Sequence, residues 1–153
     1  MDLIKPESVT VELKSKNKDE LLSELVDLLV TSGGIKRTEK DMILKKLKER
    51  ESLGSTGIGK GVGIPHAKSD KIKKMTAALG ISKDGVDFRS LDGEAAYIFF
   101  LLIAPGESPG PHLKALAKIS RLLDDKFIRE RLRSAKTNKE AYSILKDEDQ
   151  KQA

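Results

Sequence analysis

Near the middle of the chain lies Tyr97-Ile98-Phe99-Phe100-Leu101-Leu102-Ile103, an apolar run with no charged residue. A strand with one face in water alternates apolar and polar residues, whereas a strand covered on both faces reads as a continuous hydrophobic run. Because this run lacks alternation, it predicts a central strand of a sheet with both faces buried. The wider apolar segment from Ala95 to Ala104 is too short for a helix that crosses a membrane.

Outward from this run, turn signals mark its neighbours. Residues 75–82 are rich in small apolar side chains and end at the turn signal Lys83-Asp84-Gly85, which predicts a short strand. A second turn, Leu91-Asp92-Gly93, leads into the central run. On the other side, residues 105–111 contain three prolines and two glycines and predict a loop.

Two helices are expected before the strands. The first begins at Asn17, which has a carboxylate three residues later, and carries leucines at helical spacing until Gly33-Gly34 stops it. The second begins at Thr38, with Asp41 in the third position, and continues to about Arg50. Both helices therefore precede the glycine-rich stretch that follows Arg50.

Further helices follow the central strand, and their expected starts are at about Pro111, near Asp124 or Asp125, and at Thr137 with Glu140. Strands covered by helices on both faces indicate a single α/β domain. We expect this domain to span residues 1–148. The polar residues from Asp147 onward are expected to fray, with 149–153 as a polar tail.

The charges and aromatic residues argue against a nucleic-acid-binding protein. The chain of 153 residues has a formal net charge of +5, but its lysines alternate with Asp and Glu instead of forming one block. Its four phenylalanines and two tyrosines form no visible stacking platform. The lack of cysteine fits a reducing compartment, and the N-terminus does not resemble a secretion signal. We expect a soluble, cytoplasmic protein without membrane insertion.

Most of the chemistry is concentrated in the glycine-rich stretch from Gly54 to His66. Glycines let backbone N–H groups approach an anion, while hydroxyl groups add donors and Lys60 adds charge. We expect a phosphate cradle here, made by Ser55, Thr56, Gly57 and Gly59. Two features argue against a nucleotide-binding phosphate loop: Gly61 stands where that motif requires a Ser or Thr, and a charged helix end, not a buried strand, precedes it.

The two histidines lie in two different loops at strand ends. His66 follows Pro65, and His112 lies at a predicted helix N-terminus, where free N–H groups favour a nearby anion. A phosphoryl group on His66 would suit both environments. The residues alone leave other roles open: either histidine can be solvated or cap a turn or helix end, and Arg50 can be a solvated cation at the end of its helix.

The motif Glu49-Arg50-Glu51-Ser52-Leu53-Gly54-Ser55-Thr56-Gly57-Ile58-Gly59, followed by Ile64-Pro65-His66, resembles the phosphorylation-site signature of enzyme IIA domains of the bacterial sugar phosphotransferase system. It is similar to the fructose/mannitol type, which includes the nitrogen-related IIA regulators. The resemblance covers nearly the whole chain, including Leu91-Asp92-Gly93 and Pro111-His112-Leu113.

This resemblance implies a mixed-sheet α/β sandwich flanked by helices. It implies that His66 is phosphorylated on Nε2 by the phosphohistidine of HPr or of its nitrogen-system counterpart, with His112 and Arg50 beside the phosphoryl group. Neither a metal nor an organic cofactor is expected. Attack by Nε2 requires the proton on Nδ1, so we expect a backbone carbonyl near the loop to hold that proton.

The resemblance leaves two roles open. A transport IIA passes the phosphoryl group to a IIB domain, whereas a nitrogen-type regulator uses phosphorylation to choose its protein partners. Ala67-Lys68 stands where many regulators have Gly-Lys, and the segment from Leu91 to Ile103 resembles fructose-type domains. We therefore favour a fructose-family phosphocarrier, and the sugar stays undetermined because IIA domains do not bind it.

Overall fold

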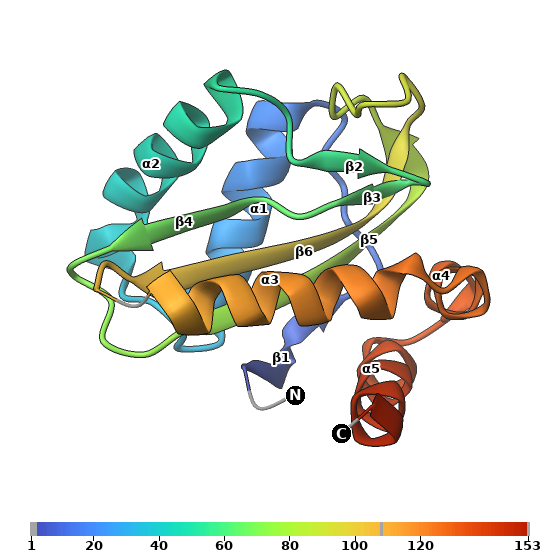
Figure 1. Cartoon of the computed structure of the whole chain (residues 1–153). Coiled ribbons are helices and arrows are strands. Elements are labelled where there is room, and N and C mark those ends of the chain that lie inside the picture. The colour runs from blue at the N-terminus through green and yellow to red at the C-terminus, as the bar shows by residue number, and fades with distance from the viewer. Residues whose placement is uncertain (1–2, 108, 153) are drawn as a thin grey trace.

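The computed structural model describes residues 3–107 and 109–152, which form a six-stranded sheet with helices on both faces (Figure 1). The strands are β1 (Ile4–Thr10), β2 (Gly57–Gly59), β3 (Val62–Gly63), β4 (His66–Ser69), β5 (Thr76–Val86) and β6 (Ala96–Pro105). The helices are α1 (Lys18–Thr31), α2 (Lys40–Ser52), α3 (Pro109–Asp124), α4 (Lys126–Ser134) and α5 (Asn138–Gln152). A 3-10 turn, η1 (Arg37–Glu39), directly precedes α2.

The sheet is mixed, as expected. Its strand order is β1-β5-β6-β3-β2, and β4 also pairs with β6. Strands β3 and β4 both run parallel to β6, one after the other, while β5 is antiparallel to it. The segment that leads to His66 therefore follows the edge of the central strand closely.

The central apolar run is confirmed as a strand, β6, with both faces buried. Ile98, Phe100 and Leu102 belong to the core shared with α3, α4 and α5. Phe99, Leu101 and Ile103 belong to the core shared with α1 and α2. Alternate side chains of one strand thus enter two separate cores, which explains why the sequence shows no polar alternation.

Several helix starts are also confirmed. The side chain of Asn17 accepts a hydrogen bond from the N–H of Glu20 at 2.9 Å and caps α1. Asp125 caps α4 by accepting from the N–H of Phe127 at 2.8 Å. The hydroxyl of Thr137 accepts from the N–H of Glu140 at 3.1 Å at the start of α5.

Two helix starts differ from the expectation. Thr38 does not cap a helix but lies inside η1, which begins at Arg37 with Lys36 as its cap. The carboxylate of Glu39 accepts from the N–H of Lys36 at 3.0 Å. Helix α3 begins at Pro109 instead of about Pro111. In both places helical structure begins before the residue that the sequence indicated as the start, Thr38 or Pro111.

The expected fraying from Asp147 is wrong for the described residues, because α5 continues to Gln152. Asp149 is buried and forms an ion pair with Lys118 of α3, while Glu148 lies 3.9 Å from Arg131 of α4. These partners lie far away in the sequence, so composition alone did not reveal them. Ala153 lies outside the described residues, and the domain limit at 148 stays a prediction. Within the described ranges, no helix has the length and apolar character needed to cross a membrane.

Candidate functional site

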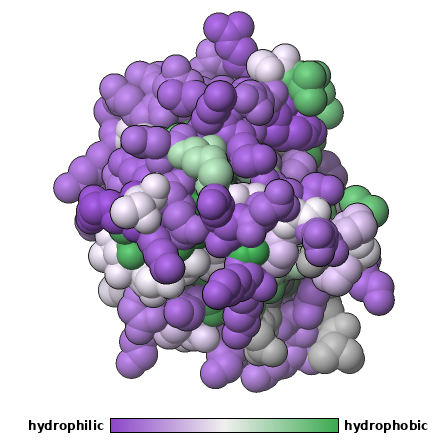
Figure 2. Space-filling model, turned by 90° about the vertical axis from the view of Figure 1, so that its left-hand side faces the viewer, coloured by the Kyte–Doolittle hydropathy of each residue, from purple (hydrophilic) through white to green (hydrophobic). Residues whose placement is uncertain are grey.

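A pocket of about 670 Å³ lies between α2, β4 and α3, and it brings together His66, His112 and Arg50. Leu53 and Leu113 also line it, and they are 85% and 66% exposed. Figure 2 shows the neighbouring side of the molecule, where α2 lies, as largely hydrophilic with small, separate hydrophobic patches. Apolar surface on this side is therefore limited to small areas.

The sheet register directs His66 toward α3. His66 is the first residue of β4 and pairs with Leu102 of β6, whose side chain enters the core covered by α3. Paired residues of parallel strands share a face of the sheet, so His66 faces the first turn of α3, which carries His112. The two imidazole ring centroids lie 5.5 Å apart, with an interplanar angle of 74°.

The tautomer of His66 follows from its hydrogen bond. Nδ1 lies 2.8 Å from the carbonyl oxygen of Ile64, and because a carbonyl can only accept, Nδ1 carries the proton. This confirms the expected backbone acceptor near the loop and leaves a lone pair on Nε2. Burial lowers the pKa of His66, the Ile64 hydrogen bond opposes this, and the positive charge of Arg50 lowers the pKa further. The neutral, nucleophilic form is favoured.

His112 is one of the residues that line the pocket. Its side chain is buried, and within the described part of the chain Nε2 has no hydrogen-bond partner. Burial lowers the pKa of His112, and it is lowered further by the charge that His66 carries when protonated and by the positive charge of Lys68. A buried polar atom without a partner is costly, so its presence beside His66 indicates a place for an incoming polar group.

Arg50 lies in the last turn of α2 and lines the pocket. One guanidinium nitrogen donates to the carbonyl of Gly54 at 2.9 Å, which holds the side chain in place. A guanidinium has five N–H donors in a planar fork, so others are left for a ligand. Lys46 and Lys68 line the same pocket with a single carboxylate, Glu49, among the described lining residues. The pocket therefore favours an anion.

Comparison with known proteins matches residues 2–148 to the family described as "Phosphoenolpyruvate-dependent sugar phosphotransferase system, EIIA 2". The chain belongs to this EIIA family. A nitrogen regulatory protein of Bradyrhizobium diazoefficiens is 37% identical to this EIIA chain over 144 residues, which are 94% of this chain and 92% of that protein. The likeness thus extends over nearly the full length of both proteins.

Fructose-specific relatives are similar to the EIIA chain as well. The fructose-specific EIIABC component of Bacillus subtilis is 34% identical over 148 residues, which cover 97% of this chain but only 23% of that longer protein. Among solved structures, the nitrogen regulatory protein IIA-Ntr of Neisseria meningitidis has a TM-score of 0.84 at 29% identity, covering 94% of this chain and 97% of that one. Both branches of the family are represented.

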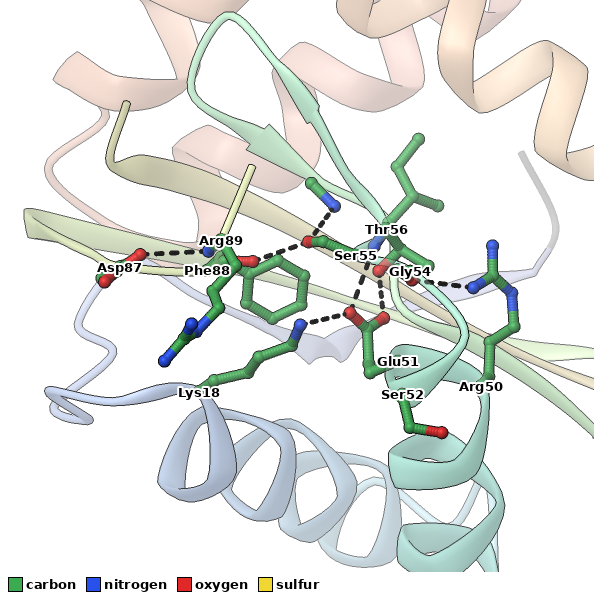
Figure 3. Close-up of polar contacts among 12 residues, drawn as sticks. Lys18, Arg50, Glu51, Ser52, Gly54, Ser55, Thr56, Asp87, Phe88 and Arg89 are labelled. Carbon is green, nitrogen blue, oxygen red and sulfur yellow. Dashed lines mark hydrogen bonds and ion pairs between the residues drawn. The ribbon is translucent and has the colours of Figure 1, made fainter. Parts of the chain in front are cut away.

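The expected phosphate cradle is not found at the pocket of the EIIA chain, because its four residues do not line it. The hydroxyl of Ser55 donates to the carbonyl of Phe88 at 2.6 Å, and Thr56 donates its N–H and its hydroxyl to Glu51 (Figure 3). Gly57 and Gly59 form β2. The four residues thus lie between α2 and β2 or within β2, outside the lining of the pocket.

Within the glycine-rich stretch, β2 and β3 form an antiparallel hairpin. Lys60 and Gly61 form its tip with φ angles of 59° and 78°, the left-handed values that two-residue hairpin turns require. A Cβ on Gly57 would lie 2.4 Å from Oγ of Ser90, so glycine is needed there for close packing. Lys60 points elsewhere and pairs with Asp124 at 2.6 Å.

Sequence reasoning missed two contributors to the site. Lys68 lines the pocket, and its position two residues after His66 on a strand places both side chains on one face. Glu51 is buried at the C-terminal end of α2, where the helix dipole disfavours a carboxylate. The spacing of Lys68 from His66 and the place of Glu51 at a helix end are present in the sequence, but they can be recognised only when the strand and helix limits are known.

Proposed function

We propose that this EIIA chain is a cytoplasmic phosphocarrier that accepts a phosphoryl group on Nε2 of His66 and passes it to a IIB component of a fructose-type sugar system. The donor is the phosphohistidine of HPr or of its nitrogen-system counterpart. One observation carries the proposal. The Ile64 carbonyl fixes the proton on Nδ1 of His66, so the lone pair of Nε2 is free beside His112 and Arg50.

The transfer needs no proton movement at His66. The Nε2 lone pair attacks phosphorus, the N–P bond of the donor breaks, and the donor imidazole takes that electron pair. The new N–P bond forms while Nδ1 keeps its proton on the Ile64 carbonyl. Because the bond broken and the bond formed are of the same type, the exchange is close to balanced and can run in either direction, as a relay requires.

The surrounding residues support the transition state. Phosphoryl transfer passes through a loose transition state with charge spread over three equatorial oxygens, so catalysis consists mainly of positioning and electrostatic stabilisation. Arg50 offers the guanidinium donors that Gly54 does not use, and His112 offers Nε2. Lys68 adds a further positive charge at the same pocket.

A second candidate function is that of a nitrogen-type regulator. The similarity to a nitrogen regulatory protein over nearly the full length of both chains favours it. In that role the same chemistry at His66 changes the affinity for protein partners, and no transfer to a IIB component follows. The two candidates share the phosphorylation step and differ only in what comes after it.

The shared step is tested by incubating the chain with enzyme I, HPr or its nitrogen-system counterpart, and phosphoenolpyruvate. We expect one acid-labile, base-stable phosphate, which is absent in His66→Gln and present at the wild-type rate in Lys114→Ala, an exposed neighbour of His112. A wild-type chain that stays unlabelled by a competent donor contradicts the proposal.

The later step is tested with a panel of IIB domains from the same genome. Transfer of label to a fructose-type IIB supports the transport role. If every IIB domain is refused and a protein partner distinguishes the phosphorylated chain from the unphosphorylated one in a binding assay, the regulatory role replaces it.

A further inference from the structure

A largely buried ion pair of Lys18 and Glu51 lies beside the turn formed by residues 54–57 (Figure 3). Nζ of Lys18 lies 2.8 Å from Oε1 of Glu51, and the two side chains are only 20% and 5% exposed. Each charge occupies the unfavourable end of its helix, because Glu51 is in the last turn of α2 and Lys18 is the first residue of α1. Helix stability therefore does not account for the pair, and burying it costs free energy.

The ion pair holds the turn through Thr56. Oε1 of Glu51 accepts from the N–H of Thr56 at 3.1 Å, and Oε2 accepts from the Thr56 hydroxyl. The Lys18 ammonium lies 4.6 Å from the ring centroid of Phe88, whose carbonyl accepts from the hydroxyl of Ser55 at 2.6 Å. Groups from α1, from α2 and from the segment after β5 thus hold one turn.

Two hydrogen-bonded connections lead from this turn to the reactive groups. The carbonyl of Thr56 accepts from the N–H of Ile64 at 3.0 Å, and the carbonyl of Ile64 accepts from Nδ1 of His66 at 2.8 Å. In the other direction, the carbonyl of Gly54 accepts from the guanidinium of Arg50 at 2.9 Å. The nucleophile and its arginine are therefore positioned relative to the same few backbone atoms.

We propose that Glu51, paired with Lys18, is a positioning residue for phosphoryl transfer: it locks the turn at Thr56 and thereby fixes the proton on Nδ1 of His66 and the place of Arg50. This inference rests on the proposed function. Glu51 acts through Thr56 and is not among the residues that line the pocket. Its negative charge also raises the pKa of His66, against the larger lowering by burial.

The test compares Glu51→Gln, which keeps the shape and removes the charge, with Thr56→Val, which removes only the hydroxyl donor. Thr56→Ser is the conservative variant that keeps this donor. The matched controls are Glu130→Gln and Thr31→Val, whose partners Lys126 and the Asp27 carbonyl lie at the surface. Labelling of His66 is followed with phosphorylated HPr and with phosphoramidate, a small N–P donor that needs no docking surface.

The tautomer of neutral His66 is read from its imidazole ¹⁵N chemical shifts. We expect Glu51→Gln and Thr56→Val to slow labelling by on the order of 10- to 100-fold, as is typical when a partner behind a reactive group is lost. We expect their neutral His66 to become a mixture of the Nδ1–H and Nε2–H forms. Thr56→Ser and both controls keep the wild-type rate and the Nδ1–H form.

Thermal midpoints distinguish a folding defect from a loss of positioning. If Glu51→Gln does not fold, the rate and tautomer of Thr56→Val provide the test. A folded variant with the wild-type rate and tautomer overturns the inference. So does a rate that falls only in proportion to the folded fraction while the tautomer stays Nδ1–H. If neither donor labels the wild-type chain, the proposed function fails, and the tautomer comparison still decides whether Glu51 positions His66.

Discussion

The pocket and the turn behind it use polar groups in opposite ways. In the pocket, Nε2 of His112 is buried and has no partner among the described residues, and Nε2 of His66 keeps its lone pair. In the turn, both oxygens of Glu51 and the hydroxyls of Ser55 and Thr56 are all hydrogen-bonded. The side chains of Glu51, Ser55 and Thr56 are thus saturated, whereas the pocket keeps unused hydrogen-bonding capacity where a ligand would lie. Oγ of Ser90, which packs against Gly57, is a further buried atom without a partner among the described residues.

The two regions also differ in charge. The turn holds one half-buried cation, Lys18, and one buried anion, Glu51, which compensate each other. The pocket has three cations and one carboxylate among its described lining residues, and the pKa values of both its histidines are lowered. The pocket is therefore suited to neutral imidazoles and an incoming anion, while the turn is suited to staying unchanged.

The largest loss of phosphoryl-transfer rate is expected from Arg50→Lys, because Arg50 contacts the turn and also lines the pocket. A lysine replaces a planar fork by a point charge and cannot hold the Gly54 carbonyl and two phosphoryl oxygens together. We expect phosphoryl transfer to His66 to fall roughly 100-fold, as when one preorganised donor is removed from an oxyanion site. The measurement is the single-turnover labelling rate, with exposed Arg121→Lys as the control. An unchanged rate would return Arg50 to the role of a solvated helix-end cation.

A smaller effect is expected from His112→Ala, which removes the unpartnered nitrogen of the pocket and leaves the turn intact. Transfer should slow by about 10-fold, the effect of losing one hydrogen bond to a charged group. Labelling rates and thermal midpoints are measured together, with Lys114→Ala as the control on the same helix. A loss of stability as large as that of a core truncation, with little loss of rate, would assign His112 a structural role.

Much of the fold was predictable because its signals are local. The apolar run at Phe99 and Phe100 predicted the central strand, and Asn17 and Asp125 predicted helix starts that the structure confirms. The end of α5 was not predictable, because its polar residues are held by partners on other helices. Local sequence carries caps and periodicity, whereas ion pairs between helices depend on the packing that they help to form.

The candidate site also has a part that the sequence predicted and a part that it did not. The motif that ends in Pro65-His66 led by resemblance to the three residues that the structure brings into one pocket. The four predicted cradle residues do not line the pocket, and glycine has two uses that a sequence does not distinguish: approach to an anion and close packing. Gly57 serves packing, since Ser90 from a distant segment occupies the space of a side chain.

Acidification should change the pocket through its two histidines. Burial is the first cause that lowers the pKa of His66 and of His112 below the ordinary 6.5. As the pH falls below about 6.5, the unfolded chain binds protons before the folded chain does, so stability falls until the lowered pKa values are passed. Labelling falls in the same direction, because protonated His66 has no lone pair on Nε2. Thermal midpoints between about pH 5 and 8 should drop less steeply in the His66→Gln/His112→Gln double variant than in the wild type. Parallel curves would contradict the lowered pKa values.

The smallest effect is expected from Lys60→Ala, which touches neither region. Lys60 was expected to add positive charge to the glycine-rich stretch, but its ammonium pairs with Asp124 at the surface, with side chains 60% and 68% exposed. Exposed ion pairs contribute little, so the labelling rate should stay within about twofold of the wild-type rate. Lys68→Ala is the matched comparison, because Lys68 lines the pocket and its loss should slow labelling more. If Lys60→Ala were the slower of the two, the hairpin tip and not the edge of β4 would supply the positive charge for the phosphoryl group, and the separation between pocket and hairpin would be wrong.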